Sequence, residues 1–120
     1  MKRRLLIPPE RQRQFDVIAA ASALTLKWAH QNCVSLETIE PVVPFVETDF
    51  SLSAWLFVDT EARLGTYRSD GTAGRLIDQF LSDLTDAGYP AEWISLVTCY
   101  FGSKEIVDRD HEGSYFFFLR

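Results

Sequence analysis

One amphipathic helix constrains the fold more than any other feature of this sequence. Its apolar stripe has five residues at helical spacing: Leu76, Ile77, Phe80, Leu81 and Leu84. Asp70 or Thr72 is expected to cap its start, and Gly88 followed by Pro90 is typical of a helix end. A helix with one apolar face buries that face against another layer, so the rest of the chain has to supply that layer.

Segments on either side of this helix alternate as strands do. Residues 50–58 become apolar on both faces toward their end, which predicts a central strand, and residues 94–101 alternate in a similar way. The aromatic segment 114–120 is predicted as a closing strand. Residues 32–49 contain two prolines, Pro41 among them, so we expect a loop or an edge strand there.

A second long helix is predicted over residues 9–31, because two prolines suit its first turn. Its apolar stripe consists of Val17, Ala21, Leu24 and Trp28. Residues 24–28 also alternate, which leaves a strand open as the alternative. Residues 59–70 are open between a strand and a short helical turn, and Ser103 together with Ile106 and Val107 suggests one further helical turn.

These elements predict an α+β protein with a single two-layer domain over residues 9–120. In it, a mainly antiparallel sheet of three to five strands packs with two main helices. The amphipathic helix is expected on one face of the sheet, and the first helix on the other face or against a second subunit. Residues 1–8 are expected to form a basic N-terminal arm.

Charge is distributed unevenly along the chain. The first thirteen residues hold five basic residues and one acidic residue, whereas residues 14–120 hold seven basic and sixteen acidic residues. An acidic body repels nucleic acid and anionic membranes and attracts basic proteins. We therefore expect a protein partner, and neither direct nucleic-acid binding nor membrane association.

Cysteine usage and hydropathy point to a soluble cytoplasmic protein. The two cysteines, Cys33 and Cys99, are too few for a disulfide framework, which fits a reducing compartment, and Cys99 is expected to be a buried thiol. The apolar part of the N-terminus, residues 5–7, is too short for a signal peptide. The longest mostly apolar stretch, residues 17–26, is too short to span a bilayer.

The sequence contains no standard catalytic, cofactor or zinc-binding motif, so no cofactor and no metal are expected. The densest polar segment, residues 103–113, carries an alternative site made of Asp108, Asp110, His111 and Glu112. A histidine among carboxylates suits a general base or a divalent metal, but a solvated turn has the same composition and is the favoured interpretation. His30 and Cys33 would supply only two metal ligands.

Aromatic residues make up 13% of the chain, enough to build a core and still leave some at an interface. If the first helix leaves one face of the sheet open, the aromatic residues there would form an exposed patch, which is typical of an interaction site. The candidates are Trp28, Trp55, Phe57, Phe116 and Phe118. A homodimer would be one way to cover them, and a simple core is the alternative.

The C-terminal part resembles small bacterial immunity-type proteins of toxin systems, or a related bacterial family without an assigned role. The resemblance covers residues 76–120 and rests on three groups of residues: Gly88-Tyr89-Pro90, then Ser103, Glu105 and Val107-Asp108-Arg109, then Gly113, Tyr115 and the closing aromatics with Arg120. Lys104 departs from the pattern, which has glutamine there. The resemblance implies a cytosolic α/β protein that binds and neutralises a toxin.

We therefore expect a non-enzymatic protein-binding module, of the immunity or inhibitor type, that binds a basic partner through an acidic surface. The candidate carboxylates are Glu37, Glu40, Glu47, Asp49, Asp78, Asp86, Asp108, Asp110 and Glu112. Two alternatives remain open: a small enzyme or metal-binding protein centred on residues 108–112, and a structural homodimer subunit.

Overall fold

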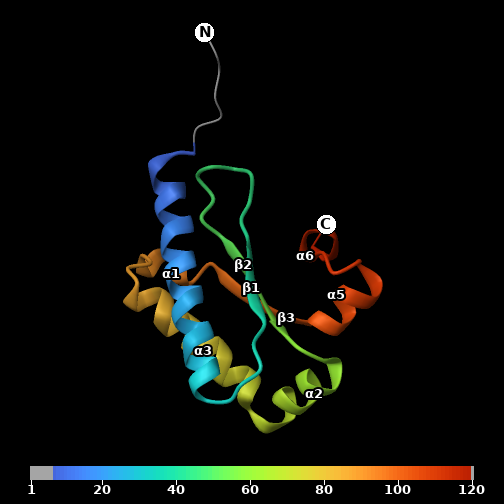
Figure 1. The fold of residues 1–120 in the computed structure, drawn as a ribbon. Coiled ribbons are helices and arrows are strands. Elements are labelled where there is room, and N and C mark those ends of the chain that lie inside the picture. Colours follow the sequence, from blue (N-terminus) through green and yellow to red (C-terminus); the bar gives the residue numbers. More distant parts are fainter. Residues whose placement is uncertain (1–6, 120) are drawn as a thin grey trace.

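The computed structural model describes residues 7–119 (Figure 1). Its elements follow in the order α1 (Pro9–Gln31), β1 (Thr38–Val42), β2 (Leu52–Val58), α2 (Glu61–Asp70), α3 (Thr72–Asp86), α4 (Ala91–Ile94), β3 (Val97–Ser103), α5 (Lys104–Asp110) and α6 (Tyr115–Phe118). Lys2, Arg3 and Arg4, which give the predicted N-terminal arm its charge, lie outside the described residues, as does Arg120. None of the helices within residues 7–119 is both long and apolar enough to cross a membrane.

The three strands form one mixed sheet in the order β1-β2-β3. The α+β class is therefore confirmed, and so are the central position of β2 and the edge position of the proline-containing strand β1. The expectation of a mainly antiparallel sheet holds for β1 and β2 only, because β2 and β3 are parallel. Helices α2, α3 and α4 connect those two strands, and such a long connection returns the chain to the same end of the sheet.

The predicted apolar face of α3 is confirmed: Leu76, Phe80 and Leu84 are fully buried. Helix α1 packs beside α3 on the same face of the sheet, rather than on the opposite face as expected (Figure 1). The stripe that α1 buries also differs from the predicted one. It consists of Arg11, Gln14, Ile18, Ala21, Thr25 and Ala29, while Leu24 is exposed. Three of these six residues are polar and pair inside the protein, which a purely apolar periodicity does not detect.

The C-terminal segment forms a short helix, so the predicted strand over residues 114–120 is wrong. Gly113 has a φ of 75°, and the Ser114 side chain then accepts a hydrogen bond from the Phe117 backbone N–H at 3.2 Å. A left-handed glycine followed by a capping serine starts a helix, whatever strand propensity the Phe residues have. Residues 61–70 are helical as well, and the helical turn predicted after Ser103 is confirmed as α5, which the Ser103 side chain caps.

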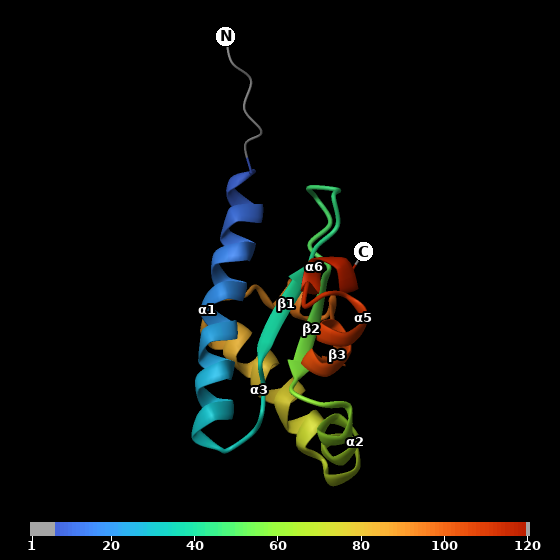
Figure 2. The same ribbon diagram turned by 45° about the vertical axis from the view of Figure 1, so that its right-hand side comes forward.

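Helices α5 and α6 lie on the other face of the sheet (Figure 2), and aromatic side chains pack between α6 and the strands. Trp55 stacks on Tyr100 with ring centroids 4.9 Å apart, and Phe118 meets both Trp55 and Phe57 edge-on at 5.4 and 5.3 Å. Gly102 makes room for this cluster, because a Cβ there would lie 2.6 Å from the Phe57 ring. Helices therefore lie on both faces of the sheet, with the two long ones together on one face.

Candidate protein-binding surface

The nine candidate carboxylates lie on separate parts of the molecule. Asp78 and Asp86 are exposed on α3, which lies across the sheet from α5 and α6 (Figure 1). The other seven lie elsewhere. Glu37 precedes β1 and Glu40 lies in it, while Glu47 and Asp49 lie in the β1–β2 loop. Asp108 and Asp110 lie in α5, and Glu112 follows it. A single partner therefore cannot contact all nine.

Glu37, Glu40 and Asp108 are brought together around Lys104 and Tyr115. Lys104 Nζ lies 2.6 Å from Asp108 Oδ2, and this hydrogen bond raises the pKa of Lys104. Burial raises the pKa of Tyr115, and the negative charges of Glu37, Asp108 and Glu40 add to that shift while Lys104 opposes it. Strand β1 and helix α5 thus share an acidic side next to α6.

In the alternative site over residues 108–112, side chains are engaged in contacts with nearby residues of the protein. The Asp110 carboxylate accepts two hydrogen bonds from Arg109, at 3.0 and 3.1 Å, which lower the pKa of Asp110. The His111 ring packs edge-on against Phe118 at 5.2 Å, and Glu112 takes a left-handed turn with φ of 54°. Over residues 7–119 no group of three or more His, Cys, Asp or Glu side chains could hold a metal ion.

His30 and Cys33 are both exposed at the end of α1, and Cys33 adopts a φ of 57°. The five candidate interface aromatics mostly lie inward. Phe57 is fully buried, Trp55 and Phe118 belong to the cluster beneath α6, and Trp28 lies under the Arg75 guanidinium at 5.5 Å. Phe116 is the one of the five that is largely exposed.

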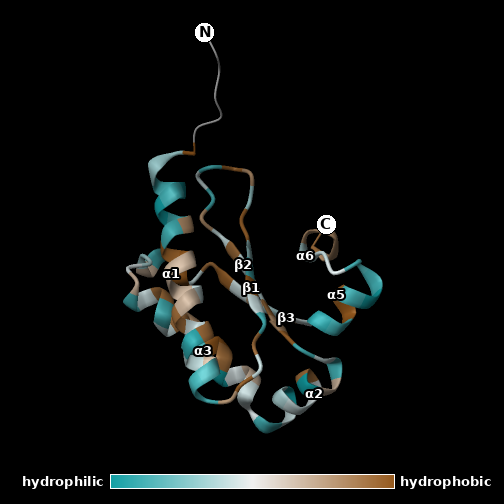
Figure 3. Cartoon of the chain, in the orientation of Figure 1, coloured by the Kyte–Doolittle hydropathy of each residue, from teal (hydrophilic) through white to brown (hydrophobic). Residues whose placement is uncertain are grey.

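The largest exposed aromatic surface lies at Phe45, at the tip of the β1–β2 hairpin. Phe45 is fully exposed, and its neighbour Val46 is 61% exposed. The hairpin tip stands opposite α6, and both are coloured hydrophobic in Figure 3. Between them lies a hollow of about 650 Å³, lined by Glu40, Pro41, Val42, Val43, Phe45, Phe116 and Leu119. We call Glu40, Val42, Phe45, Val46 and Phe116 the hairpin–α6 surface.

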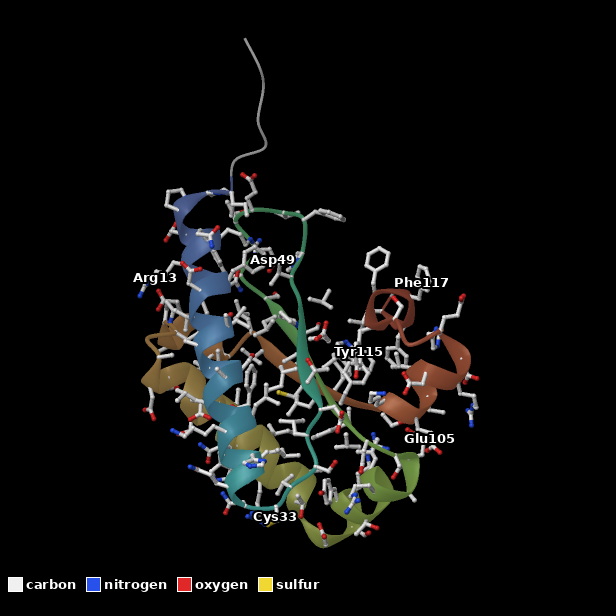
Figure 4. All side chains as sticks on the ribbon, in the orientation of Figure 1. Arg13, Cys33, Asp49, Glu105, Tyr115 and Phe117 are labelled. Atoms are coloured by element: carbon white, nitrogen blue, oxygen red, sulfur yellow. The ribbon has the colours of Figure 1, made fainter. Side chains whose placement is uncertain are left out.

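Helix α6 has two distinct sides at this surface (Figure 4). Tyr115 lies on the side of the sheet, where its ring meets Phe57 edge-on with centroids 4.7 Å apart. Phe117 lies on the outer side and is about half exposed. Tyr115 anchors the helix to the sheet, and Phe117 adds an exposed apolar ring next to Phe116, with ring centroids 6.0 Å apart.

Arg11 fixes the hairpin loop from behind. Its buried guanidinium donates to the backbone carbonyls of Val46 at 2.7 Å and Asp49 at 2.9 Å, and lies 5.3 Å from the centroid of the Phe50 ring. Gln14 accepts a further hydrogen bond from Arg11 and donates to the Phe50 carbonyl. Because the Arg11 guanidinium holds the backbone carbonyls of this loop, Phe45 is presented in a defined position.

The Asp49 side chain closes the loop on its other side. Hydrogen bonds from the hydroxyl and the backbone N–H of Ser51, at 2.6 and 3.0 Å, lower the pKa of Asp49, and the charge of Arg11 contributes in the same direction. A second hollow of about 400 Å³ lies between this loop and the start of α1, and Phe45, Phe15 and Glu47 are among its lining residues. Phe45 therefore stands between two apolar hollows, each with a glutamate in its wall.

Sequence reasoning did not select Phe45 or Arg11. The sequence did contain a signal for Phe45. Residues 41–46 are all apolar, and the two prolines among them exclude a central strand, so this apolar segment is expected at the surface. Arg11 was grouped with the basic N-terminal residues, and nothing in its sequence neighbourhood distinguishes a buried guanidinium from an exposed one. No family model matches this chain, and no curated protein or solved structure matches it either.

Proposed function

We propose that this protein is a non-enzymatic protein-binding module that binds a basic partner through the hairpin–α6 surface. One observation carries the proposal: fully exposed Phe45 and largely exposed Phe116 line one apolar hollow of about 650 Å³. Exposed aromatic side chains around a concave apolar surface are the usual anchors of protein–protein interfaces.

The charge around the hollow defines the chemistry of the partner. Glu40 lines this hollow, Glu47 lines the neighbouring one, and Glu37 lies near enough for its charge to act on Tyr115. The chain as a whole carries a net charge of −5. A complementary partner presents apolar side chains that fill the hollow and lysine or arginine residues that face these carboxylates.

The partner is expected to dock by its side chains rather than by adding a strand to β1. Pro41 lies in that edge strand and has no backbone N–H to donate. The loop that carries Phe45 is already held by Arg11, so little conformational entropy is lost when a partner binds. This preorganisation favours a tight complex over a small area.

The C-terminal resemblance suggests which kind of binding module this is: an immunity or inhibitor protein of a bacterial toxin system that acts in the cytoplasm. The residues that carry the resemblance have structural roles: Gly88 ends α3 with a φ of 101°, Ser103 caps α5, and Val107 is fully buried. These roles explain why such residues occur at these positions of this fold, while the hairpin–α6 surface supports binding of a basic toxin.

A phage-displayed library of random peptides tests this function without a known partner. The immobilised wild-type protein should enrich peptides that combine aromatic or aliphatic residues with lysine or arginine. Phe45→Ser should lose most of this enrichment, because the anchor is exposed and its loss leaves the fold intact. Glu40→Lys combined with Glu47→Lys should weaken binding mainly at low salt.

The matched control is Asp78→Lys combined with Asp86→Lys, which makes the same charge change on α3, across the sheet. These two substitutions should leave the selected peptides bound. Equal loss of binding in both charge variants would show that only net charge matters, and no enrichment by the wild-type protein would reject the binding module.

A further inference from the structure

The two edges of the sheet are built differently. Edge strand β1 contains Pro41 and the charged Glu40, both of which discourage pairing with another strand. Edge strand β3, Val97–Ser103, contains neither a proline nor a charged residue, and the uncharged stretch extends over residues 94–103. Natural sheets usually protect an edge of this length, so an unprotected edge indicates a place where strands pair.

The register of β3 shows which of its backbone groups face outward. Leu52 pairs with Val97 in the parallel ladder, and its N–H donates to the carbonyl of Leu96 at 3.1 Å. In a parallel ladder, the residues that bond to the neighbouring strand alternate with residues that point away from it. The N–H and C=O groups of Val97, Cys99 and Phe101 therefore point away from β2.

These outward groups have no hydrogen-bond partner within residues 7–119. They are three donors and three acceptors in one row, spaced as in any edge strand. Thr98 and Tyr100, whose side chains flank this row, are exposed, as is Leu96 at the start of the strand. The first part of the strand, residues 96–100, is thus accessible, whereas Gly102 and Ser103 at its end are buried.

We propose that β3 pairs antiparallel with β3 of a second copy of this chain, so that two three-stranded sheets join into one across a two-fold axis. An antiparallel pair of identical strands is self-complementary, as a two-fold interface requires. This proposal does not depend on the proposed partner of the hairpin–α6 surface, which lies beyond β2 at the other edge of the sheet.

The register follows from the outward residues. If the two-fold axis passes at Cys99, then Cys99 faces Cys99 of the second copy, and Val97 faces Phe101 of the second copy. All three outward residues then exchange both of their hydrogen bonds. Thr98 lies opposite Tyr100 of the second copy on the exposed face, a pairing of β-branched and aromatic residues that favours sheets.

Charge selects a second copy as the occupant of this edge. Each chain carries a net charge of −5, so two copies repel each other over most of their surfaces. Over residues 94–103 there is no charge, and two copies meet there without placing carboxylates opposite each other. A basic partner, in contrast, gains no attraction from an uncharged edge.

Amide hydrogen exchange of the native protein, followed by NMR, tests the pairing directly. The N–H groups of Thr98 and Tyr100 bond to β2 and should be protected at every protein concentration. Those of Val97, Cys99 and Phe101 should become protected as the concentration rises, together with a dimer in sedimentation equilibrium. A monomer at all concentrations, with these three amides unprotected, would overturn the proposal.

A pair of variants isolates the backbone donor. Cys99→Pro removes the outward N–H at the two-fold axis, while Cys99→Ala removes the same side chain and keeps the N–H. The proline variant should be monomeric by sedimentation and the alanine variant dimeric. A dimer in both variants would place the interface elsewhere, and exchange of the wild-type amides decides the matter if the proline variant does not fold.

Discussion

Thr25 of α1 donates a hydrogen bond to the carboxylate of Asp83 in α3, at 2.8 Å, in the interior between the two helices. Both residues are buried, and the other oxygen of Asp83 accepts a hydrogen bond from Gln79 at 3.0 Å. The two longest helices are thus joined by a polar contact rather than only by apolar packing. Buried polar groups need such partners, because an unpaired one costs the free energy of its lost hydration.

Replacing Thr25 by valine should lower the free energy of unfolding by about 1–3 kcal/mol, because the shape is kept while Asp83 loses a buried donor. Urea denaturation measures this change. Thr85→Val is the matched control, since Thr85 is exposed on α3 and, within residues 7–119, its hydroxyl bonds only to the Leu81 carbonyl. The control should change stability by less than about 0.5 kcal/mol.

The pair can then be tested as a unit. Combining Thr25→Val with Asp83→Leu removes both polar groups, so the double variant should be more stable than the sum of the two single changes predicts. Strictly additive changes would mean that the two side chains do not interact, in contradiction to the hydrogen bond between them.

The same contact explains why the position of α1 was mispredicted. The extent of α1 follows from its prolines and its helical periodicity, and the structure confirms both of its ends. Its orientation depends on Arg11, Gln14 and Thr25. These polar side chains can be buried because each donates a hydrogen bond to an acceptor on a distant segment of the chain. A pattern of apolar residues within one segment carries no information about partners from 35 or 58 positions away.

Arg11→Lys should destabilise the protein and loosen the hairpin loop. A lysine keeps the charge but not the planar fork that reaches Gln14 and several loop carbonyls at once. We expect a loss of about 2 kcal/mol in the free energy of unfolding and faster amide exchange in residues 45–51. Arg13→Lys, at an exposed position on the same helix, should leave both quantities unchanged.

If Arg11→Lys unfolds at the same urea concentration as the wild type, the guanidinium does not hold the loop. If stability falls while exchange in the loop stays slow, the loop is held by Asp49 and Ser51 instead. Either result would show that the Arg11 guanidinium is not the group that fixes the position of Phe45, and faster exchange without Arg11 is needed to support it.

The candidate surface was only partly predictable for a related reason. Glu40, Glu47 and Phe116 were all selected from composition, because charged and aromatic residues stand out in a sequence. Their grouping depends on the turn at residues 43–51 and on the helical form of residues 115–118. Since α6 was predicted as a strand, Phe116 was placed on a sheet face rather than beside the hairpin tip.

Gly102→Ala should destabilise the protein, because its Cβ would lie 2.6 Å from the Phe57 ring, which is itself enclosed by Tyr115 and Phe118. Overpacking of this kind costs about 1–3 kcal/mol. Gly74→Ala is the control: nothing lies within 4 Å of the added Cβ in α3, so the variant should be more stable by roughly 0.5–1 kcal/mol. Thermal unfolding of both variants gives the comparison, and a stable Gly102→Ala protein would show that the aromatic cluster can move aside.

The partly buried thiol of Cys99 should make stability depend on pH in the alkaline range. Burial raises the pKa of Cys99 from 9.0 to about 11, so the unfolded chain releases this proton at lower pH than the folded one. The contribution of the protonated Cys99 thiol to the free energy of unfolding is therefore complete below pH 9, and it is lost as the pH rises to 11. The difference in unfolding free energy between the wild type and Cys99→Ala should be constant below pH 9 and shrink above it. Because both proteins share every tyrosine and lysine that titrates in this range, a difference that stays constant up to pH 11 would show that Cys99 is not buried in the folded state.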